Sequence, residues 1–343
     1  MKPYLAIPLA VLVAAVWLLP VPAAEPQNVT ITVSDDHIDF LAGKELIGRY
    51  NKGPNVAKPY MWPVHGPGGV PLTRAWPMMQ GQPGESTDHV HQKSLWFCHG
   101  DVIPEGIPIK EKIKGVEGVD FWSENKGAGR IVCTRVETPT MAKNHGRVTT
   151  SNEWRTADGQ KILDEQRTIH LYDLGDAKLF VFDIELHASV CPITFGDTKE
   201  GSFGIRINDA IREEMVIDKK RVKGPGQIEN AEGKIGEKQC WGQVSAWCDY
   251  SGPLEGKTVG LAILADPANP VPSCWHARGY GLMAANPFGR SGSGFPAMKG
   301  KTDLVKLEKG GRLKLRYGVL LHPGDAKTGK VAEYFERFVK LRG

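Results

Sequence analysis

The stretch KLFVFDIELH, residues 178–187, decides the fold class because its side chains alternate in character along the chain. In an extended chain, successive side chains point to opposite faces. One face would then be wholly apolar, with Phe180, Phe182, Ile184 and Leu186. The other would be mainly polar, with Val181, Asp183, Glu185 and His187. This alternation predicts a β-strand with one buried face.

Similar short segments recur on both sides of this strand. Between residues 202 and 208, three apolar side chains alternate with Gly204, Arg206 and Asn208. Further strands are predicted at four segments, residues 29–33, 36–42, 259–264 and 313–321. The 343 residues include 40 Gly and 24 Pro, enough to interrupt most long helices. These features predict an all-β protein, a large antiparallel β-sandwich or a barrel.

One helix is predicted, at the C-terminus, where apolar residues recur with helical spacing. They are Val331, Tyr334, Phe335, Phe338 and Val339. We expect this helix to pack on the edge or end of a sheet. The chain has no internal repeat of fixed period, so we treat residues 24–343 as one domain. The Gly-rich segment 289–300 is the best place for a boundary, if there is one.

Residues 1–23 have the features of a signal peptide. Lys2 precedes an apolar stretch at Leu5–Leu19, and Val21-Pro22-Ala23 supplies small residues before the expected cleavage site. This pattern predicts a periplasmic or extracellular protein. A retained membrane anchor is the alternative, but the apolar run is shorter than the ~20 residues that span a bilayer. Later apolar stretches have strand length, so we expect no membrane contact after signal removal.

The composition and motifs exclude several classes of protein. The net charge of +4 comes without a clustered basic face, which argues against a nucleic-acid partner. The six Cys form no C-x-x-C pair, which argues against a zinc site, and their disulfide pairing stays open. Motifs of serine hydrolases, P-loop proteins, zincins and dinucleotide-binding enzymes do not occur.

The densest polar cluster is Asp88-His89-Val90-His91, followed by aromatic residues, His99 and Asp101. If this segment is extended, His89 and His91 project from the same face. Two imidazoles on one face could bind a metal or act in acid/base catalysis. A structural or surface role is the alternative.

A second cluster begins at Cys274-Trp275-His276-Ala277-Arg278-Gly279-Tyr280 and ends near Asn286. Trp275 and Tyr280 offer flat apolar faces on which a sugar ring could stack. His276 and Arg278 would share one face of an extended segment and could bind hydroxyl groups. The alternative is a strand that lines the core, with Arg278 in a buried ion pair.

Two strands predicted above also carry polar faces. Arg206 and Asn208 lie on one of them, and Asp183 and Glu185 on the other. Such a face is either solvated or lines a substrate groove. A carboxylate from it, Glu185 or Asp183, would be the natural general base if a histidine is the acid.

Several blocks resemble the PmoA-like family, whose members are known as methane oxygenase PmoA. The blocks are residues 58–60, 68–78, 88–102, 119–122, 275–289 and 321–325, in the family's order. Where that family reads Asp-His-Pro-His-His-Arg-Gly, this chain has Val90, Gln92, Lys93 and Ser94 in place of Pro, the last His, Arg and Gly. A role that needs the third imidazole is therefore not implied.

The family is similar to β-supersandwich proteins of the galactose mutarotase type. That likeness implies a broad sheet that binds a sugar, with His and a carboxylate in proton transfer. Methane oxidation is not implied, because the true monooxygenase subunits of that name are helical membrane proteins.

We therefore expect a secreted carbohydrate-active enzyme of hydrolase, lyase or epimerase type, with a non-catalytic carbohydrate-binding protein as the alternative. Its partner would be a carbohydrate or sugar-derived small molecule. No cofactor is certain, although His89 and His91 could hold a divalent metal. The acid/base candidates are His89, His91, His276 and Glu185. The substrate-binding candidates are Tyr60, Arg74, Trp96, His99, Asp101, Trp122, Arg206, Asn208, Trp275, Arg278, Tyr280 and Asn286.

Overall fold

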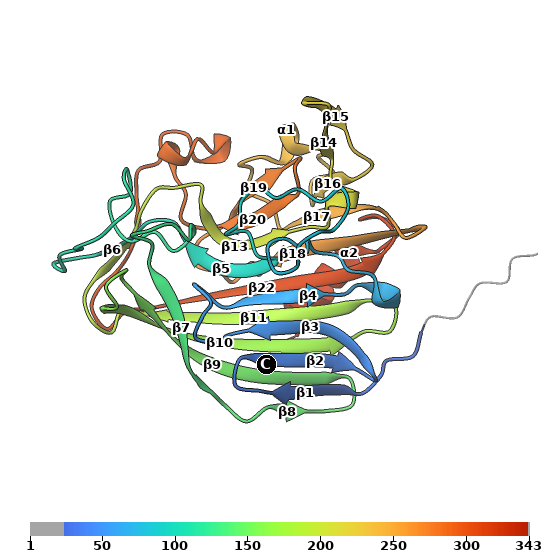
Figure 1. Cartoon of the computed structure of the whole chain (residues 1–343), viewed down its shortest axis with the longest axis horizontal. Helices are drawn as coiled ribbons and strands as arrows, with labels where there is room; N and C mark the ends of the chain where they lie inside the picture. The colour runs from blue at the N-terminus through green and yellow to red at the C-terminus, as the bar shows by residue number, and fades with distance from the viewer. Residues whose placement is uncertain (1–23, 342–343) are drawn as a thin grey trace, which may run out of the picture.

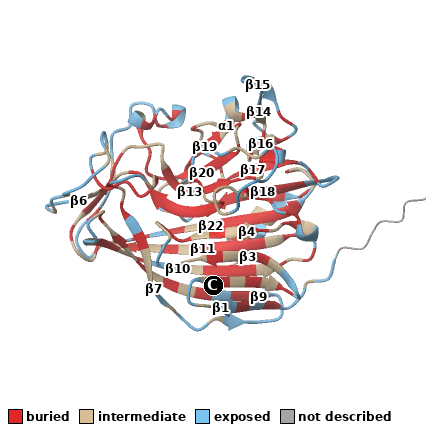
Figure 2. Cartoon of the chain, in the orientation of Figure 1, coloured by how far each residue is buried: buried red, intermediate tan, exposed pale blue. Residues whose placement is uncertain are grey.

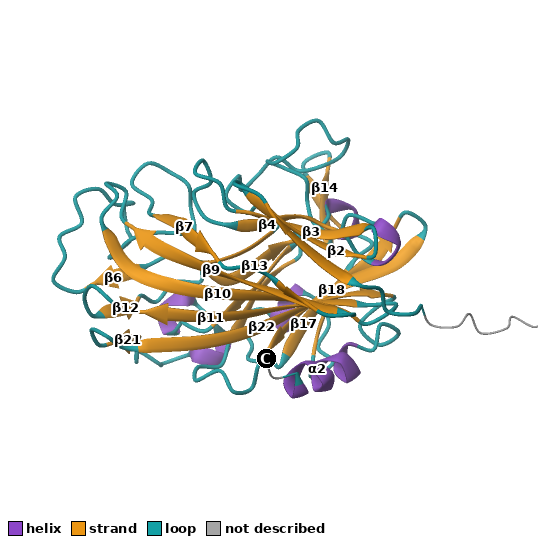
Figure 3. Ribbon diagram, turned by 90° about the horizontal axis from the view of Figure 1, so that it is seen from below, coloured by secondary structure: helices purple, strands orange, loops and turns teal. Residues whose placement is uncertain are grey.

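The computed structural model describes residues 24–341, so the predicted signal peptide at residues 1–23 lies outside the described residues. Two large antiparallel sheets are stacked on each other (Figures 1 and 3). The first sheet has eight strands in the order β1-β2-β3-β4-β5-β13-β20-β19. The second has nine, in the order β16-β17-β18-β22-β11-β10-β9-β7, with β8 paired to β9. Small sheets β21-β12-β6 and β14-β15 lie outside this sandwich.

The strands of the eight-stranded sheet are β1 (Val29–Val33), β2 (His37–Ala42), β3 (Glu45–Asn51), β4 (Tyr60–Val64), β5 (Leu95–His99), β13 (Gly201–Arg206), β19 (Cys274–Arg278) and β20 (Leu282–Asn286). Those of the nine-stranded sheet are β7 (Arg130–Val136), β8 (Thr140–Met141), β9 (His145–Arg155), β10 (Lys161–Asp173), β11 (Lys178–His187), β16 (Gln227–Asn230), β17 (Trp247–Leu254), β18 (Lys257–Ala265) and β22 (Arg312–Pro323). The small sheets contain β6 (Val102–Pro104), β12 (Ile193–Phe195), β21 (Val305–Leu307), β14 (Glu214–Ile217) and β15 (Lys220–Lys223). The helices are α1 (Glu237–Cys240) and α2 (Val331–Lys340), with 3-10 turns η1 (Pro67–Gly69), η2 (Asp209–Ile211), η3 (Ser291–Ser293) and η4 (Pro296–Met298).

The main core lies between the two large sheets, whose strands are largely buried (Figure 2). Buried side chains from both sheets form one hydrophobic cluster there. Phe203 of the first sheet contacts Phe182 and Tyr317 of the second, with both ring centroids 5.0 Å away. Phe97 packs edge-on against Trp154 in the same way. Aromatic rings that meet at such distances add to the hydrophobic stabilisation that burial of their area provides.

The strand at residues 178–187 is confirmed as β11, with its apolar face in this core. Val181 on its other face packs in a second cluster under α2, which includes Val331 and Phe338. The predicted C-terminal helix is therefore confirmed, but it lies on the outer face of β18 and β22 rather than at a sheet edge. The expected large antiparallel β-sandwich with a C-terminal helix is confirmed.

Three further observations bear on the sequence-based expectations. Within residues 24–341, no helix has both the length and the apolar character that crossing a membrane requires. All six cysteines, which lie between Cys98 and Cys274, are unpaired. Residues 289–300 form a loop with two 3-10 turns that packs on Cys274. The assignment of residues 24–343 to one domain stays a prediction.

Candidate functional site

A cavity of about 490 Å³ lies on the outer face of the eight-stranded sheet, and we call it the histidine pocket. On β19, Trp275 and Ala277 point into the core, so His276 and Arg278 point to the opposite face and line the cavity. The shared face predicted for these two residues is confirmed. The other walls come from loops, from the strands β14 and β15 and from the helix α1. They contribute His89, His91, Gln92, Asp120, Trp122, Ser123, Lys199, Glu200, Glu214, Arg221, Glu237 and Tyr280.

The two polar clusters found in the sequence meet in this pocket. The ring of His89 stacks on that of Tyr280, with centroids 5.2 Å apart. His91 lies edge-on to His89 at 5.7 Å and near Trp122 at 6.4 Å. The segment is not extended as we had assumed, because the Gln92 amide donates to the His89 carbonyl and His89 has a φ of +45°. A turn, rather than a strand, places both imidazoles in the pocket.

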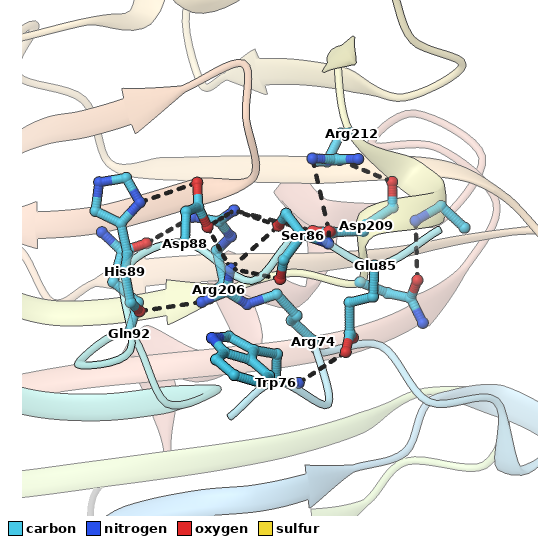
Figure 4. A network of polar contacts seen from close by, with 12 residues as sticks. Arg74, Trp76, Glu85, Ser86, Asp88, His89, Gln92, Arg206, Asp209 and Arg212 are labelled. Atoms are coloured by element: carbon cyan, nitrogen blue, oxygen red, sulfur yellow. Dashed lines mark hydrogen bonds and ion pairs between the residues drawn. The ribbon is translucent and has the colours of Figure 1, made fainter. Parts of the chain in front are cut away.

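His89 is held by a carboxylate that is itself anchored on two buried arginines (Figure 4). Its Nδ1 lies 3.0 Å from Asp88 Oδ2. Asp88 Oδ1 accepts hydrogen bonds from Arg74 Nη1 at 2.5 Å and Arg206 Nη2 at 3.0 Å. Burial raises the pKa of Asp88, but contacts with His89, Arg206 and Arg74 lower it by a larger amount. The pKa of Asp88 therefore lies well below its usual range. Asp88 is therefore ionised and fixes the orientation of the His89 ring.

His276 is fixed as one tautomer. Its Nδ1 lies 2.8 Å from the Lys199 carbonyl, which can only accept, so Nδ1 carries the proton and Nε2 has a free lone pair. Burial, together with the charge of Arg278, lowers the pKa of His276 to about 3. Burial also lowers the pKa of His91 to about 4, with a further contribution from Lys58. Both imidazoles are neutral at physiological pH.

Glu200 brings a carboxyl group that the sequence reasoning missed. Burial raises its pKa above the usual value; Lys199 opposes this shift and Asp120 adds to it. The pairing of β13 with β5 carries Glu200 to the pocket, since the Gly100 amide donates to the Glu200 carbonyl. The segment Thr198-Lys199-Glu200-Gly201 has no recognisable pattern, so only the strand pairing reveals its position.

The arginine side chains of the pocket are each paired with a glutamate that also lines it. Arg278 forms a 3.0 Å ion pair with Glu237, and its guanidinium lies 3.7 Å from the centre of the Trp241 ring. Arg221 lies 3.3 Å from Glu214. Such pairs present fixed donors and acceptors without a large excess of either charge.

Several predicted substrate-binding residues do not line the pocket. Arg74, Trp96, His99, Arg206, Trp275 and Asn286 are all buried. Trp96 packs beneath Trp122 at 5.1 Å, and Trp275 donates to the Ser245 carbonyl. Asn286 bonds the backbone of residues 198 and 199 and of 288 and 289, so its role is to fix these loops. Tyr60 on β4 does not line the histidine pocket. The Lys93 ammonium lies over the Tyr60 ring in a cation–π contact.

Other predicted residues also have structural roles. His99 bonds the Gly196 carbonyl, and Asp101 accepts from the Gly118 amide. Asn208 caps the η2 turn by accepting from the Ala210 amide. These polar groups satisfy backbone atoms that would otherwise be unpaired.

Glu185, which we predicted as a general base, lies outside the histidine pocket. Glu185 is on β11 of the other large sheet, where it lines a separate cavity of about 500 Å³. Its carboxylate pairs with Arg312 and with Lys314 at 3.3 Å. The polar face of this strand therefore belongs to a different surface from the histidine pocket.

The described residues do not fit the expected metal site. Among residues 24–341, no group of three or more His, Cys, Asp or Glu side chains is arranged to hold a metal ion. His89 Nδ1 is directed to Asp88, and His91 has no third protein ligand beside it.

The fold and the pocket define a β-sandwich protein with a polar, histidine-lined cavity. Residues 37–336 match a family of unknown function, DUF6807, and the chain belongs to that family. The resemblance to the PmoA-like family is thereby corrected, because the family that matches nearly the whole chain is a different one.

Comparison with other known proteins gives only a distant likeness in fold. None of the curated proteins matches the chain. An α-galactosidase from Lactobacillus brevis is 8% identical with a TM-score of 0.40, and the match covers 87% of this chain and 40% of that one. The GH36 α-galactosidase AgaB from Geobacillus stearothermophilus is 8% identical with a TM-score of 0.42, covering 88% and 42%. The chain thus spans about 40% of the length of these proteins.

Proposed function

We propose that the protein is an exported enzyme that acts on a neutral carbohydrate bound in the histidine pocket. The observation that carries the proposal is the position of two proton-transfer groups in one cavity, the Asp88-held His89 and Glu200. The signal-like N-terminal sequence supports the export that we include in this proposal.

The charge balance of the pocket favours a neutral ligand. Its cationic side chains are Lys199, Arg221 and Arg278, and each lies beside a glutamate of the same pocket. An anionic or cationic substrate would have to compete with these pairs. Hydroxyl groups can instead donate to the carboxylates and accept from the guanidinium groups at the same time.

The aromatic residues supply the apolar part of such a site. Tyr280 is half-buried, and Trp122 stands at the pocket wall with its ring 15° from the plane of His276. Ligand sites commonly combine aromatic walls with a few fixed polar groups.

The protonation states assign the roles. Asp88 orients His89 through its Nδ1, so the other ring nitrogen, Nε2, can exchange a proton with the substrate. Glu200, with its raised pKa, is the second proton-transfer group. His91 and His276 stay neutral and bind hydroxyl groups, with His276 Nε2 as an acceptor. Hydrolysis, elimination and epimerisation all use such a pair.

The test is a product screen with the full mature chain. Neutral mono- and disaccharides and their glycosides are incubated with the protein and followed by NMR and mass spectrometry. We expect His89→Ala and Glu200→Gln each to lower kcat by about 10²-fold or more, as for loss of a proton-transfer group. His187→Ala and Glu185→Gln, on the other sheet, are the matched controls and should retain activity.

Two outcomes would contradict the assignment. Turnover that survives both pocket variants would remove His89 and Glu200 from the chemistry. Binding of a sugar by calorimetry, without any product from the native protein, would leave a carbohydrate-binding protein instead of an enzyme.

A further inference from the structure

A second cavity, of about 570 Å³, is lined in part by the same loop as the histidine pocket and differs from that pocket in character. Much of its wall is apolar, with Trp62, Pro63, Met79, Pro83 and Met215. We call it the methionine pocket. Met79 is 48% exposed, and its sulfur accepts a hydrogen bond from Gln82 at 3.0 Å. Polarisable methionine side chains adapt their shape and make favourable contacts with aromatic rings.

The Arg206 guanidinium links the carboxylate beside His89 to the lining of the methionine pocket. Arg206 Nη2 lies 3.0 Å from Asp88, the partner of His89, and 4.0 Å from Asp209 Oδ1. Asp209 lines the methionine pocket. Figure 4 shows this arrangement, with His89 and Gln92 at one end of the network and Glu85 and Asp209 at the other. The Asp88 side chain is 44% exposed, so this network reaches the solvent.

The β14–β15 hairpin contributes to both pockets with opposite faces. Glu214 and Arg221 line the histidine pocket, whereas Met215 lines the methionine pocket. Residues opposite each other in the hairpin share a face, so Ile217 and Val222 lie on the Met215 face. They are 53% and 37% exposed and extend the apolar surface beyond the cavity.

We propose that the methionine pocket binds the apolar aglycone of a glycoside whose sugar occupies the histidine pocket. This inference rests on the proposed function and adds the class of substrate. One ligand is favoured because one loop, residues 82–92, and one hairpin, β14–β15, both contribute side chains to the two cavities. An aromatic aglycone fits the combination of methionine, proline and tryptophan side chains.

Isothermal calorimetry with matched probes tests this arrangement. Methyl and 4-nitrophenyl glycosides of the same neutral sugars are titrated into the mature chain. We expect the 4-nitrophenyl member to bind at least about tenfold more tightly, since burial of its ring adds apolar contact area. The M79S/M215S variant should lose this preference and keep its affinity for the methyl glycoside. Met141→Ser, on β8 of the other sheet, is the control and should change neither affinity.

The outcomes separate this inference from the proposed function. If the methyl and 4-nitrophenyl glycosides bind equally well, the aglycone site is wrong while the sugar site stands. The same holds if the preference survives in M79S/M215S. If neither member of any pair binds, both the sugar site and the aglycone site are wrong.

Discussion

The imidazole of His89 and the phenol ring of Tyr280 lie parallel to within 3°, with their centroids 5.2 Å apart. This contact joins two segments that are far apart in the sequence and fixes the position of the proposed proton-transfer group. Tyr280 also contacts Arg206, whose guanidinium lies 4.7 Å from the centroid of the tyrosine ring. The stack is therefore continuous with the arginine network behind the pocket.

We expect Tyr280→Ala to release the His89 ring and to weaken sugar binding about tenfold, as for the loss of one aromatic contact. The His89 imidazole resonances in NMR spectra should move towards those of a solvent-exposed histidine. Tyr280→Phe keeps the ring and should leave these resonances nearly unchanged. Equal spectra for the Ala and Phe variants would show that the stack does not hold His89.

Asp88→Asn should free the His89 ring and leave Arg74 and Arg206 without their shared carboxylate. Both arginines are fully buried, but Asp88 is 44% exposed, so we expect a loss of about 2 kcal/mol rather than the ~3–5 of a fully buried pair. Urea unfolding measures this loss, and nitrogen NMR reports the tautomer of His89. An unchanged tautomer would mean that Asp88 does not orient the ring.

Acid should destabilise the fold through two buried histidines. Burial lowers the pKa of His99 to about 4 and that of His276 to about 3, whereas unfolded histidine titrates near ~6.5. Below that pH the unfolded chain binds protons that the folded chain excludes, so stability falls as the pH drops from about 6.5 towards 4. Urea midpoints at pH 7 and pH 5 check this. His99→Gln should reduce the difference between them, and an unchanged difference would contradict the assignment.

Another histidine, His322, should make the folded state less stable as the pH rises. His322 and Asp249 are both buried, with Nε2 2.7 Å from Oδ1. Burial alone would lower the pKa of His322, but the charge and hydrogen bond of Asp249 raise it. Its stabilisation is therefore complete below about pH 6.5 and is lost as the pH rises through the raised pKa. Thermal unfolding between pH 6 and pH 9 measures this loss, which should be absent in His322→Gln.

Glu165→Gln should be strongly destabilising. Glu165 forms a buried pair with Arg167 at 2.6 Å and also accepts from Trp154 and Asn152. Removal of its charge leaves the Arg167 guanidinium uncompensated in the core, at a cost of about 3–5 kcal/mol. Glu137→Gln is the matched control, because its pair with Arg135 is exposed and should contribute less than ~1 kcal/mol. Similar losses in chemical denaturation would contradict the reasoning.

The fold class could be predicted from the sequence because the patterns that indicate strands and helices are local. Alternation over residues 178–187 and helical spacing over residues 331–339 depend only on neighbouring side chains, and both are confirmed as β11 and α2. The position of α2 could not be predicted from the sequence. The surface that α2 covers is formed by Val181 and Leu320, which belong to two different strands. That surface exists only after the strands pair.

The site was predicted in part for the same reason. His89, His91, His276, Arg278 and Tyr280 stood out by their residue types, and the structure places them together. Glu200 had no local signal, because it reaches the pocket through the pairing of β5 with β13. Arg206 was expected to contact substrate from a polar strand face, but loop residues 85–92 cover that face and leave it buried.

The segment between β4 and β5 has a consequence for how such proteins can diverge. Residues 75–94 contain no helix or strand, yet they contribute walls to both pockets and the carboxylate that orients His89. Insertions or exchanges in this one loop could alter ligand choice without disturbing the register of either large sheet. Members of the family could then differ in ligand preference through this loop alone, while the two large sheets keep the same strand pairing.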